Sequence, residues 1–174
     1  MVFTQTENLQ RIALITGASR GLGLTLASAL ASRGWELIID ARGGDALEEA
    51  RSQLSKFTQV TAIPGDIREL QHRQALAEAA RRSGGLDLVI NNASTIGQSP
   101  MPKLLEYPLE ALEEVYRINV LAPLGLIQEV KQLIKPRAAI INVTSDAGVE
   151  AYSGWGGLWL KQGCPRASDR HPGS

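Results

Sequence analysis

The stretch Thr16-Gly17-Ala18-Ser19-Arg20-Gly21-Leu22-Gly23 decides the fold. It follows a buried-type apolar run at residues 11–16 and precedes a helical pattern at residues 22–32. Glycines between a strand and a helix allow a tight turn, a close approach of the backbone to a pyrophosphate and close packing of helix on sheet. The helix N-terminus adds free N–H groups and a partial positive charge. This context favours a dinucleotide-binding turn over one that merely connects strand to helix.

Apolar runs alternate with helical patterns along the rest of the chain. Runs that are apolar throughout and separated by helices indicate a parallel sheet covered on both faces. We therefore predict an α/β fold, a Rossmann-type doubly wound parallel sheet, incomplete with about five strands. In the first helix we expect Leu22, Leu26 and Leu30 on one face, and we expect Pro123 to kink the last helix. Strands are expected at residues 11–16, 36–41, 59–63, 86–91 and 138–143, and helices at 22–32, 46–54, 68–82 and 109–133.

Composition excludes several classes of protein. Lys and Arg total 18, as do Asp and Glu, so no net charge favours nucleic acid or an anionic membrane. No apolar run approaches the ~18 residues that span a bilayer, and the first ten residues do not resemble a secretory signal. Cys164 is the only cysteine in the sequence, which excludes an internal disulfide framework and a cysteine-rich zinc site. We expect a cytoplasmic protein with no metal.

Further motifs follow the glycine-rich turn in a fixed order. Asp66-Ile67 follows the third predicted strand, Asn91-Asn92-Ala93 ends the fourth, Asn119 lies in the long helix, and Ser145 follows the fifth strand. Together with the TGxxxGxG pattern of residues 16–23, these motifs resemble the short-chain dehydrogenase/reductase family over residues 10–157. The family's NNAG motif is matched except that Ser94 replaces its glycine. The resemblance implies a nicotinamide cofactor held by Gly17, Ser19, Arg20, Gly21, Leu22, Gly23, Arg42, Asp66, Ile67, Asn92 and Ala93.

The end of the second predicted strand bears on which cofactor binds. Asp40 falls one residue before the position where NAD-binding members of the family carry aspartate, and Ala41 occupies that position. Alternation along a strand turns neighbouring side chains to opposite faces. Arg42 and Arg20 match the cations that accommodate a 2′-phosphate. We expect NADP(H), with NAD(H) as the alternative and a solvated loop cation as the other interpretation of Arg42.

The resemblance also implies a reaction. Members of the family move a hydride between nicotinamide and a carbonyl or alcohol carbon, and a tyrosine transfers the proton with help from a lysine four residues later. Ser145 would bind the substrate oxygen, and Asn119 would hold a water of the proton relay. As alternatives, Ser145 caps a turn and Asn119 satisfies helix backbone. A small-molecule carbonyl or alcohol is the expected partner, and full-length relatives are expected to be homo-oligomers.

The tyrosine and the lysine are missing from the positions where the resemblance places them. Those positions hold Leu158 and Gln162, and no Y-x-x-x-K occurs in the sequence. One permitted back-translation of residues 158–174, shifted by one nucleotide, gives YGSSKAALEHLIAILG, with Tyr for Leu158 and Lys for Gln162. We therefore expect a partial nucleotide-binding domain at residues 1–157 and an aberrant, disordered tail at residues 158–174, read in a shifted frame.

Three functional hypotheses follow. The first is an NADP(H)-dependent oxidoreductase whose present chain is inactive. The second is a non-catalytic nucleotide-binding or regulatory fragment. The third, a relative of the sugar-nucleotide epimerases, is disfavoured by the NNA-like motif. In a shortened fold the fifth strand would be an exposed sheet edge, and the long helix would expose an apolar stripe.

Overall fold

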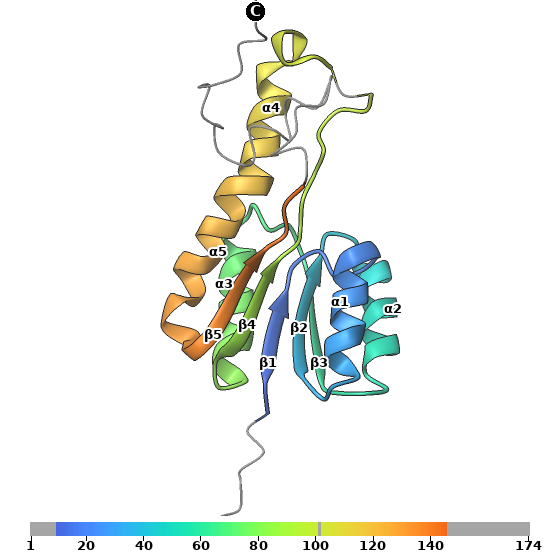
Figure 1. Ribbon diagram of the computed structural model, residues 1–174, viewed down its shortest axis with the longest axis vertical. Coiled ribbons are helices and arrows are strands. Elements are labelled where there is room, and N and C mark those ends of the chain that lie inside the picture. Colours follow the sequence, from blue (N-terminus) through green and yellow to red (C-terminus); the bar gives the residue numbers. More distant parts are fainter. Residues whose placement is uncertain (1–9, 101, 146–174) are drawn as a thin grey trace, which may run out of the picture.

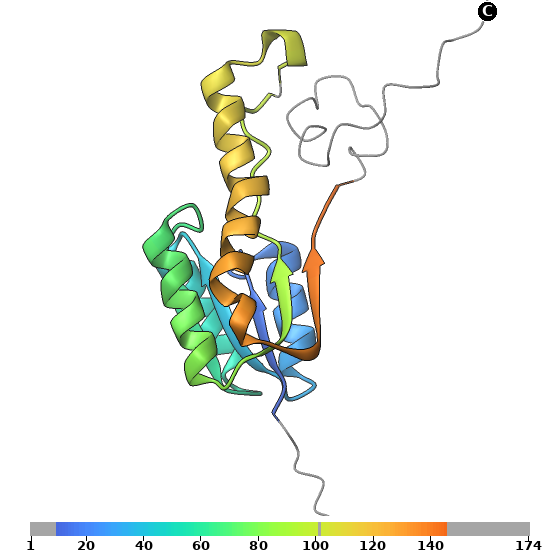
Figure 2. The same ribbon diagram turned by 90° about the vertical axis from the view of Figure 1, so that its left-hand side faces the viewer.

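A computed structural model describes residues 10–100 and 102–145 of the 174-residue chain. Its centre is a parallel sheet of five strands in the order β3-β2-β1-β4-β5. Helices α1 and α2 cover one face and α3 and α5 (Ala122–Val130) cover the other, while α4 (Leu109–Tyr116) extends beyond the end of the sheet (Figures 1 and 2). The predicted fold class is therefore confirmed. The strands are β1 (Ile12–Ile15), β2 (Glu36–Ala41), β3 (Val60–Pro64), β4 (Leu86–Asn91) and β5 (Ile134–Asn142), and the first three helices are α1 (Gly21–Ala31), α2 (Gly44–Leu54) and α3 (Leu70–Arg82).

The three leucines at helical spacing do not form the buried face of α1. Leu22 is 53% exposed, whereas Gly23, Ala27 and Ala31 are buried against the sheet. Leu26 and Leu30 are only partly buried, at the edge of this contact. Small side chains at every fourth position let the helix axis approach the strands closely, which the larger leucines would prevent.

The long helix expected at residues 109–133 is present but interrupted. It runs through α4 (Leu109–Tyr116), the π-helical turn η2 (Arg117–Leu121), α5 (Ala122–Val130) and the 3-10 turn η3 (Lys131–Leu133). Pro123 has no N–H and cannot bond to the carbonyl four residues earlier, which belongs to Asn119. The irregularity expected at Pro123 thus takes the form of a wide turn directly before it, and Asn119 lies in that turn.

Two apolar surfaces remain open in the described part of the chain. Strand β5 forms an edge of the sheet, and its Ile140 and Ile141 are 43% and 47% exposed. Leu121 and Leu124 of the long helix are also exposed, as expected. Within the described ranges, no helix combines the length and the apolar character needed to cross a membrane. Leu158, Gln162 and the expected tail lie outside the described residues.

Candidate functional site

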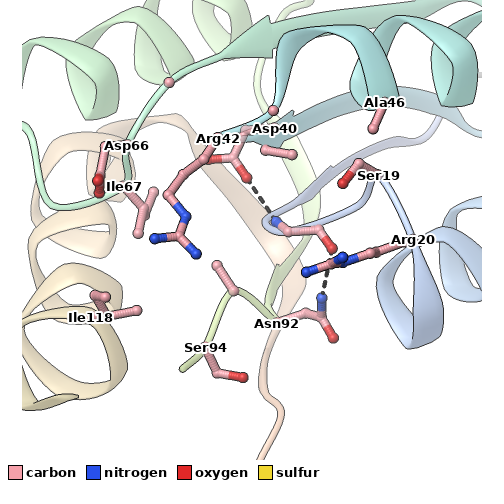
Figure 3. A pocket seen from close by; sticks show the side chains of 15 residues that line it. Ser19, Arg20, Asp40, Arg42, Ala46, Asp66, Ile67, Asn92, Ser94 and Ile118 are labelled. Atoms are coloured by element: carbon pink, nitrogen blue, oxygen red, sulfur yellow. Dashed lines mark hydrogen bonds between the residues drawn. The ribbon is translucent and has the colours of Figure 1, made fainter. Parts of the chain in front are cut away.

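A cleft of about 450 Å³ lies where the carboxyl ends of β1, β2, β3 and β4 meet (Figure 3). Ligands of open α/β sheets bind at this edge, so its position fits a nucleotide site. The structure brings most of the predicted cofactor residues to its walls. These are Gly17, Ser19, Arg20, Arg42, Asp66, Ile67, Asn92 and Ala93. The sequence analysis missed Gly43, Ala46, Gly65 and Ile118 as lining residues, and no motif marked them.

Gly21, Leu22 and Gly23 do not line this cleft, although the resemblance implied that they hold the cofactor. Gly23 has a packing role, because a Cβ atom there would lie 2.3 Å from the carbonyl oxygen of Gly17. Gly21 has a φ of +57°, in the left-handed region where glycine is favoured, and the space around it is open. Leu22 lies on the exposed side of α1.

The glycine-rich turn is fixed from the neighbouring strand. Gly17 has a φ of +67°, and the side-chain amide of Asn92 donates 3.0 Å hydrogen bonds to the carbonyl oxygens of Thr16 and Gly17. The hydroxyl of Thr16 accepts from the backbone N–H groups of Asn92 and Ala93, each at 3.0 Å. The loop after β4 and the turn after β1 therefore form one hydrogen-bonded wall.

Asp40 does not present a free carboxylate to the cleft. Its side chain is buried, Oδ1 accepts from the Gly17 N–H at 2.7 Å, and Oδ2 lies 2.9 Å from Nε2 of His72 (Figure 3 draws the first of these bonds). Because this side chain is only 2% exposed and both its oxygens have partners inside the fold, the carboxylate is not arranged to bind a ribose. Ala41, the residue at the position expected to select the cofactor, is buried and has no polar group.

Two arginines extend into the cleft from opposite sides. Arg42 comes from the loop after β2, and Arg20 comes from the turn before α1 (Figure 3). Both residues are exposed. Within the part of the chain that the structure describes, neither guanidinium donates a hydrogen bond or forms an ion pair. They are arranged to receive an anion.

Asp66 is held by an arginine that sequence analysis overlooked. Arg68 donates to both carboxylate oxygens, at 2.6–3.1 Å, and also pairs with Glu114 of α4 at 2.9 Å. The side-chain hydrogen bonds from Arg68 hold the pKa of Asp66 below its ordinary value, and the charges of Arg68 and Arg42 act in the same direction. Asp66 is therefore a persistent hydrogen-bond acceptor at the wall of the cleft.

The side-chain amide of Asn119 is bonded to the loop after β4. Its Oδ1 accepts from the Thr95 N–H at 2.9 Å, and its Nδ2 donates to the Thr95 carbonyl at 2.8 Å. The side chain thus satisfies the backbone of the loop after β4, rather than its own helix. Asn119 also borders a second cavity of about 350 Å³, which shares Ala93 with the first. Ser145 is half-buried and lies one residue after Thr144 of that cavity's wall.

Comparison with known proteins identifies the family. The family model described as short chain dehydrogenase matches residues 11–157. The chain belongs to the short-chain dehydrogenase family. The match covers the glycine-rich turn, both cavities and every described strand. Within residues 10–100 and 102–145, no group of three or more His, Cys, Asp or Glu side chains is placed to hold a metal ion.

Individual members of the family are moderately similar. The rhamnolipids biosynthesis 3-oxoacyl-[acyl-carrier-protein] reductase of Pseudomonas aeruginosa is 34% identical, over 81% of this chain and 57% of its own length. The solved RhlG/NADP active-site complex of Pseudomonas aeruginosa has a TM-score of 0.76 at 31% identity, covering 87% of this chain and 61% of that one. A 7α-hydroxysteroid dehydrogenase complexed with NADH has a TM-score of 0.79 at 26% identity, covering 89% and 62%. The chain thus spans little more than half the length of these relatives.

Proposed function

We propose that this chain is the nucleotide-binding part of an NADP(H)-dependent short-chain dehydrogenase that acts on a carbonyl or alcohol. The proposal rests on Arg20 and Arg42, whose guanidinium groups line the cleft and form no hydrogen bond or ion pair within the described residues. An NAD-selective site needs a free carboxylate for the ribose hydroxyls, whereas here Ala41 is apolar and Asp40 is bonded inside the fold. A dianionic 2′-phosphate fits two cations.

The remaining walls of the cleft suit the other parts of the cofactor. The turn that contains Gly17 and Ser19 would take the pyrophosphate at the N-terminus of α1. Asp66 would accept from the adenine amino group, and Ile67 would pack on the base. When bound, the cofactor supplies or accepts the hydride. The NADP complex of a 31%-identical relative supports this assignment, and the NADH complex of a 26%-identical one keeps NAD(H) as the alternative.

Titration with both cofactors tests the proposal. Isothermal titration of the 174-residue chain is expected to show binding of NADP+ and binding of NAD+ that is at least about tenfold weaker. Preference for NAD+ would contradict the assignment of the two arginines. Absence of binding to either dinucleotide would contradict the nucleotide site itself.

For catalysis, we propose that Ser145 and Asn119 belong to an active site whose tyrosine and lysine this chain lacks. Leu158 and Gln162 stand where the family's tyrosine and lysine are expected. We also propose that the nucleotide-binding domain ends near residue 157 and that residues 158–174 are read in a shifted frame. The shifted frame restores both residue types at their required positions, which supports this interpretation.

Resequencing and frame restoration test this second part. Resequencing of the locus is expected to reveal the frame that encodes Y-x-x-x-K. Reductase activity on a panel of carbonyl compounds is expected only from the restored version, and the 174-residue chain serves as the control. A shifted frame without Y-x-x-x-K would contradict the proposal. If the chain binds NADP+ and the restored version remains inactive, the alternative of a non-catalytic nucleotide-binding protein is supported.

A further inference from the structure

A buried carboxylate lies directly behind the glycine-rich turn. The side chain of Asp40 is 2% exposed, and its Oδ1 accepts from the backbone N–H of Gly17 at 2.7 Å. The carbonyl oxygen of Asp40 also accepts from the Ala18 N–H at 2.9 Å. Asp40 therefore fixes two successive N–H groups of the turn, one through its side chain and one through its backbone.

The second oxygen of this carboxylate is bonded to His72 of α3. Nε2 of His72 lies 2.9 Å from Oδ2 of Asp40, and the imidazole is 7% exposed. We assign the His72 tautomer with its proton on Nε2, so that the imidazole donates and the carboxylate accepts. The pair joins α3 to the end of β2.

The fold makes room for this ring at one glycine. A Cβ atom on Gly65 would lie 2.3 Å from Nδ1 of His72 and 2.8 Å from Cγ and Cε1. Gly65 has no positive φ, so steric contact with the ring rather than backbone conformation excludes a side chain there. The imidazole ring thus lies between the carboxylate of Asp40 and the backbone of Gly65.

A gain in folding stability does not by itself explain why Asp40 and His72 are buried as a pair. Apolar side chains of similar size often stabilise a buried position as well as a charged pair does. An apolar residue at position 40, however, would leave the Gly17 N–H without its acceptor. Gly17 has a φ of +67°, in the left-handed region, and this conformation directs the turn that faces the cleft.

We propose that Asp40 and His72 are positioning residues for the phosphate-binding turn. His72 orients the carboxylate of Asp40, and Asp40 holds Gly17 so that the turn is formed before the dinucleotide arrives. The proposal rests on the proposed function, since it assigns the pyrophosphate to this turn. Asp40 lines the cleft, but both its carboxylate oxygens are bonded to Gly17 and His72, and His72 does not line the cleft, so the effect on the ligand is indirect.

A comparison of two ligands distinguishes an effect on the position of the turn from a general loss of folded structure. NADP+ places its pyrophosphate on the backbone of the turn, whereas adenosine 2′-monophosphate lacks the pyrophosphate and keeps only the part expected at Asp66 and at the guanidinium groups of Arg20 and Arg42. His72→Leu is expected to weaken the binding of NADP+ about tenfold, which is the effect of losing a hydrogen bond to a carboxylate. The same variant is expected to weaken the binding of adenosine 2′-monophosphate by less than about twofold. His72→Gln keeps a side-chain N–H donor and is expected to restore much of the NADP+ affinity.

Asp87 provides a matched control at the other end of the sheet. Its Oδ2 accepts from the Ile12 N–H at 2.9 Å and from Nζ of Lys135 at 2.8 Å, so it too joins a backbone N–H to a side-chain donor. Both Asp87→Ala and Asp40→Ala are expected to lower the unfolding midpoint, Asp40→Ala by more because its side chain is 2% exposed against 28% for Asp87. Only Asp40→Ala is expected to weaken the binding of NADP+. Equal weakening by both variants would mean that the pair acts through stability alone and would overturn the proposal.

Hydrogen exchange tests the same inference without any nucleotide. The Gly17 amide of the ligand-free chain is expected to exchange about tenfold faster in Asp40→Ala and His72→Leu, and near the wild-type rate in His72→Gln. If His72→Leu does not fold, Gly65→Ala displaces the ring while both partners remain, and the same acceleration is expected. Unchanged Gly17 exchange would overturn the proposal. If the wild-type chain binds no dinucleotide, the proposed function fails, and the exchange rates still decide whether the pair holds the turn.

Discussion

The side-chain amide of Asn92 donates a 3.0 Å hydrogen bond to the carbonyl oxygen of Gly17. This bond fastens the glycine-rich turn to the loop after β4. The same two groups surround Gly23, because a Cβ atom there would lie 2.3 Å from the Gly17 oxygen and 2.5 Å from the Asn92 Nδ2. The turn, the loop and the first helix are therefore packed around one small residue.

We expect Gly23→Ala to disrupt this contact. The added methyl group meets the backbone of Gly17 as well as the side chain of Asn92, so the unfolding free energy should fall by about 1–3 kcal/mol, as for overpacked sites. The variant should also lose NADP+ binding, because the turn that lines the cleft is displaced. Urea unfolding and titration measure both effects. Gly43→Ala is the control, since Gly43 has φ −84° and no atom within 4 Å of its virtual Cβ. Equal stability of the two variants would contradict the packing role of Gly23.

We expect Arg42→Ala to change cofactor preference. Loss of one of two cations on the 2′-phosphate should weaken NADP+ by about 10- to 100-fold and leave NAD+ within about twofold. Isothermal titration with both cofactors gives the ratio. Arg33→Ala serves as the control, because Arg33 is exposed and donates only to the Ala29 carbonyl. An equal loss for the two cofactors would contradict a phosphate-specific role.

We expect Arg68→Ala to alter acid stability. The pKa of Asp66 is lowered in the folded chain, chiefly by hydrogen bonds from Arg68. The carboxylate therefore stabilises the fold at pH values above its unfolded-state pKa, and this stabilisation is lost as the pH falls through the folded-state pKa. The variant should lose about 1 kcal/mol at pH 7, and the difference should shrink on acidification.

Urea unfolding between pH 7 and pH 2 measures this difference. Arg51→Ala is a suitable comparison, because Arg51 and Glu48 form an exposed pair one helical turn apart. Its effect should be smaller at every pH. A difference between wild type and Arg68→Ala that stays constant down to pH 2 would show that Arg68 acts through packing instead.

We expect Asn119→Ala to destabilise the chain. The variant leaves the N–H and the carbonyl of Thr95 without their partners in a half-buried loop. The unfolding free energy should fall by about 2–3 kcal/mol. The exposed Gln128→Ala on the same long helix should change it by less than about 0.5 kcal/mol. Chemical denaturation followed by circular dichroism compares them, and similar values would contradict the structural role of Asn119.

Local sequence patterns predicted the sheet well. Strands β2 and β4 begin and end at the residues expected, because apolar runs bounded by polar turns leave few alternatives. Strand β5 begins at Ile134, four residues before the expected start, since its pairing with Leu86 of β4 extends it. The spacing of the leucines did not indicate the buried face of α1. Close packing on the sheet requires small side chains, and Gly23, Ala27 and Ala31 are the residues buried there.

The sequence by itself determined which segments form parallel strands, the glycine-rich turn and most residues that line the cleft, because each depends on neighbours along the chain. Only the tertiary structure decided how the polar side chains are paired. Asp40 and His72 are 32 residues apart and Asn119 and Thr95 are 24 apart, so no local periodicity marks them. Their bonds form because a packed interior must satisfy buried polar groups with whatever partners the fold brings within about 3 Å.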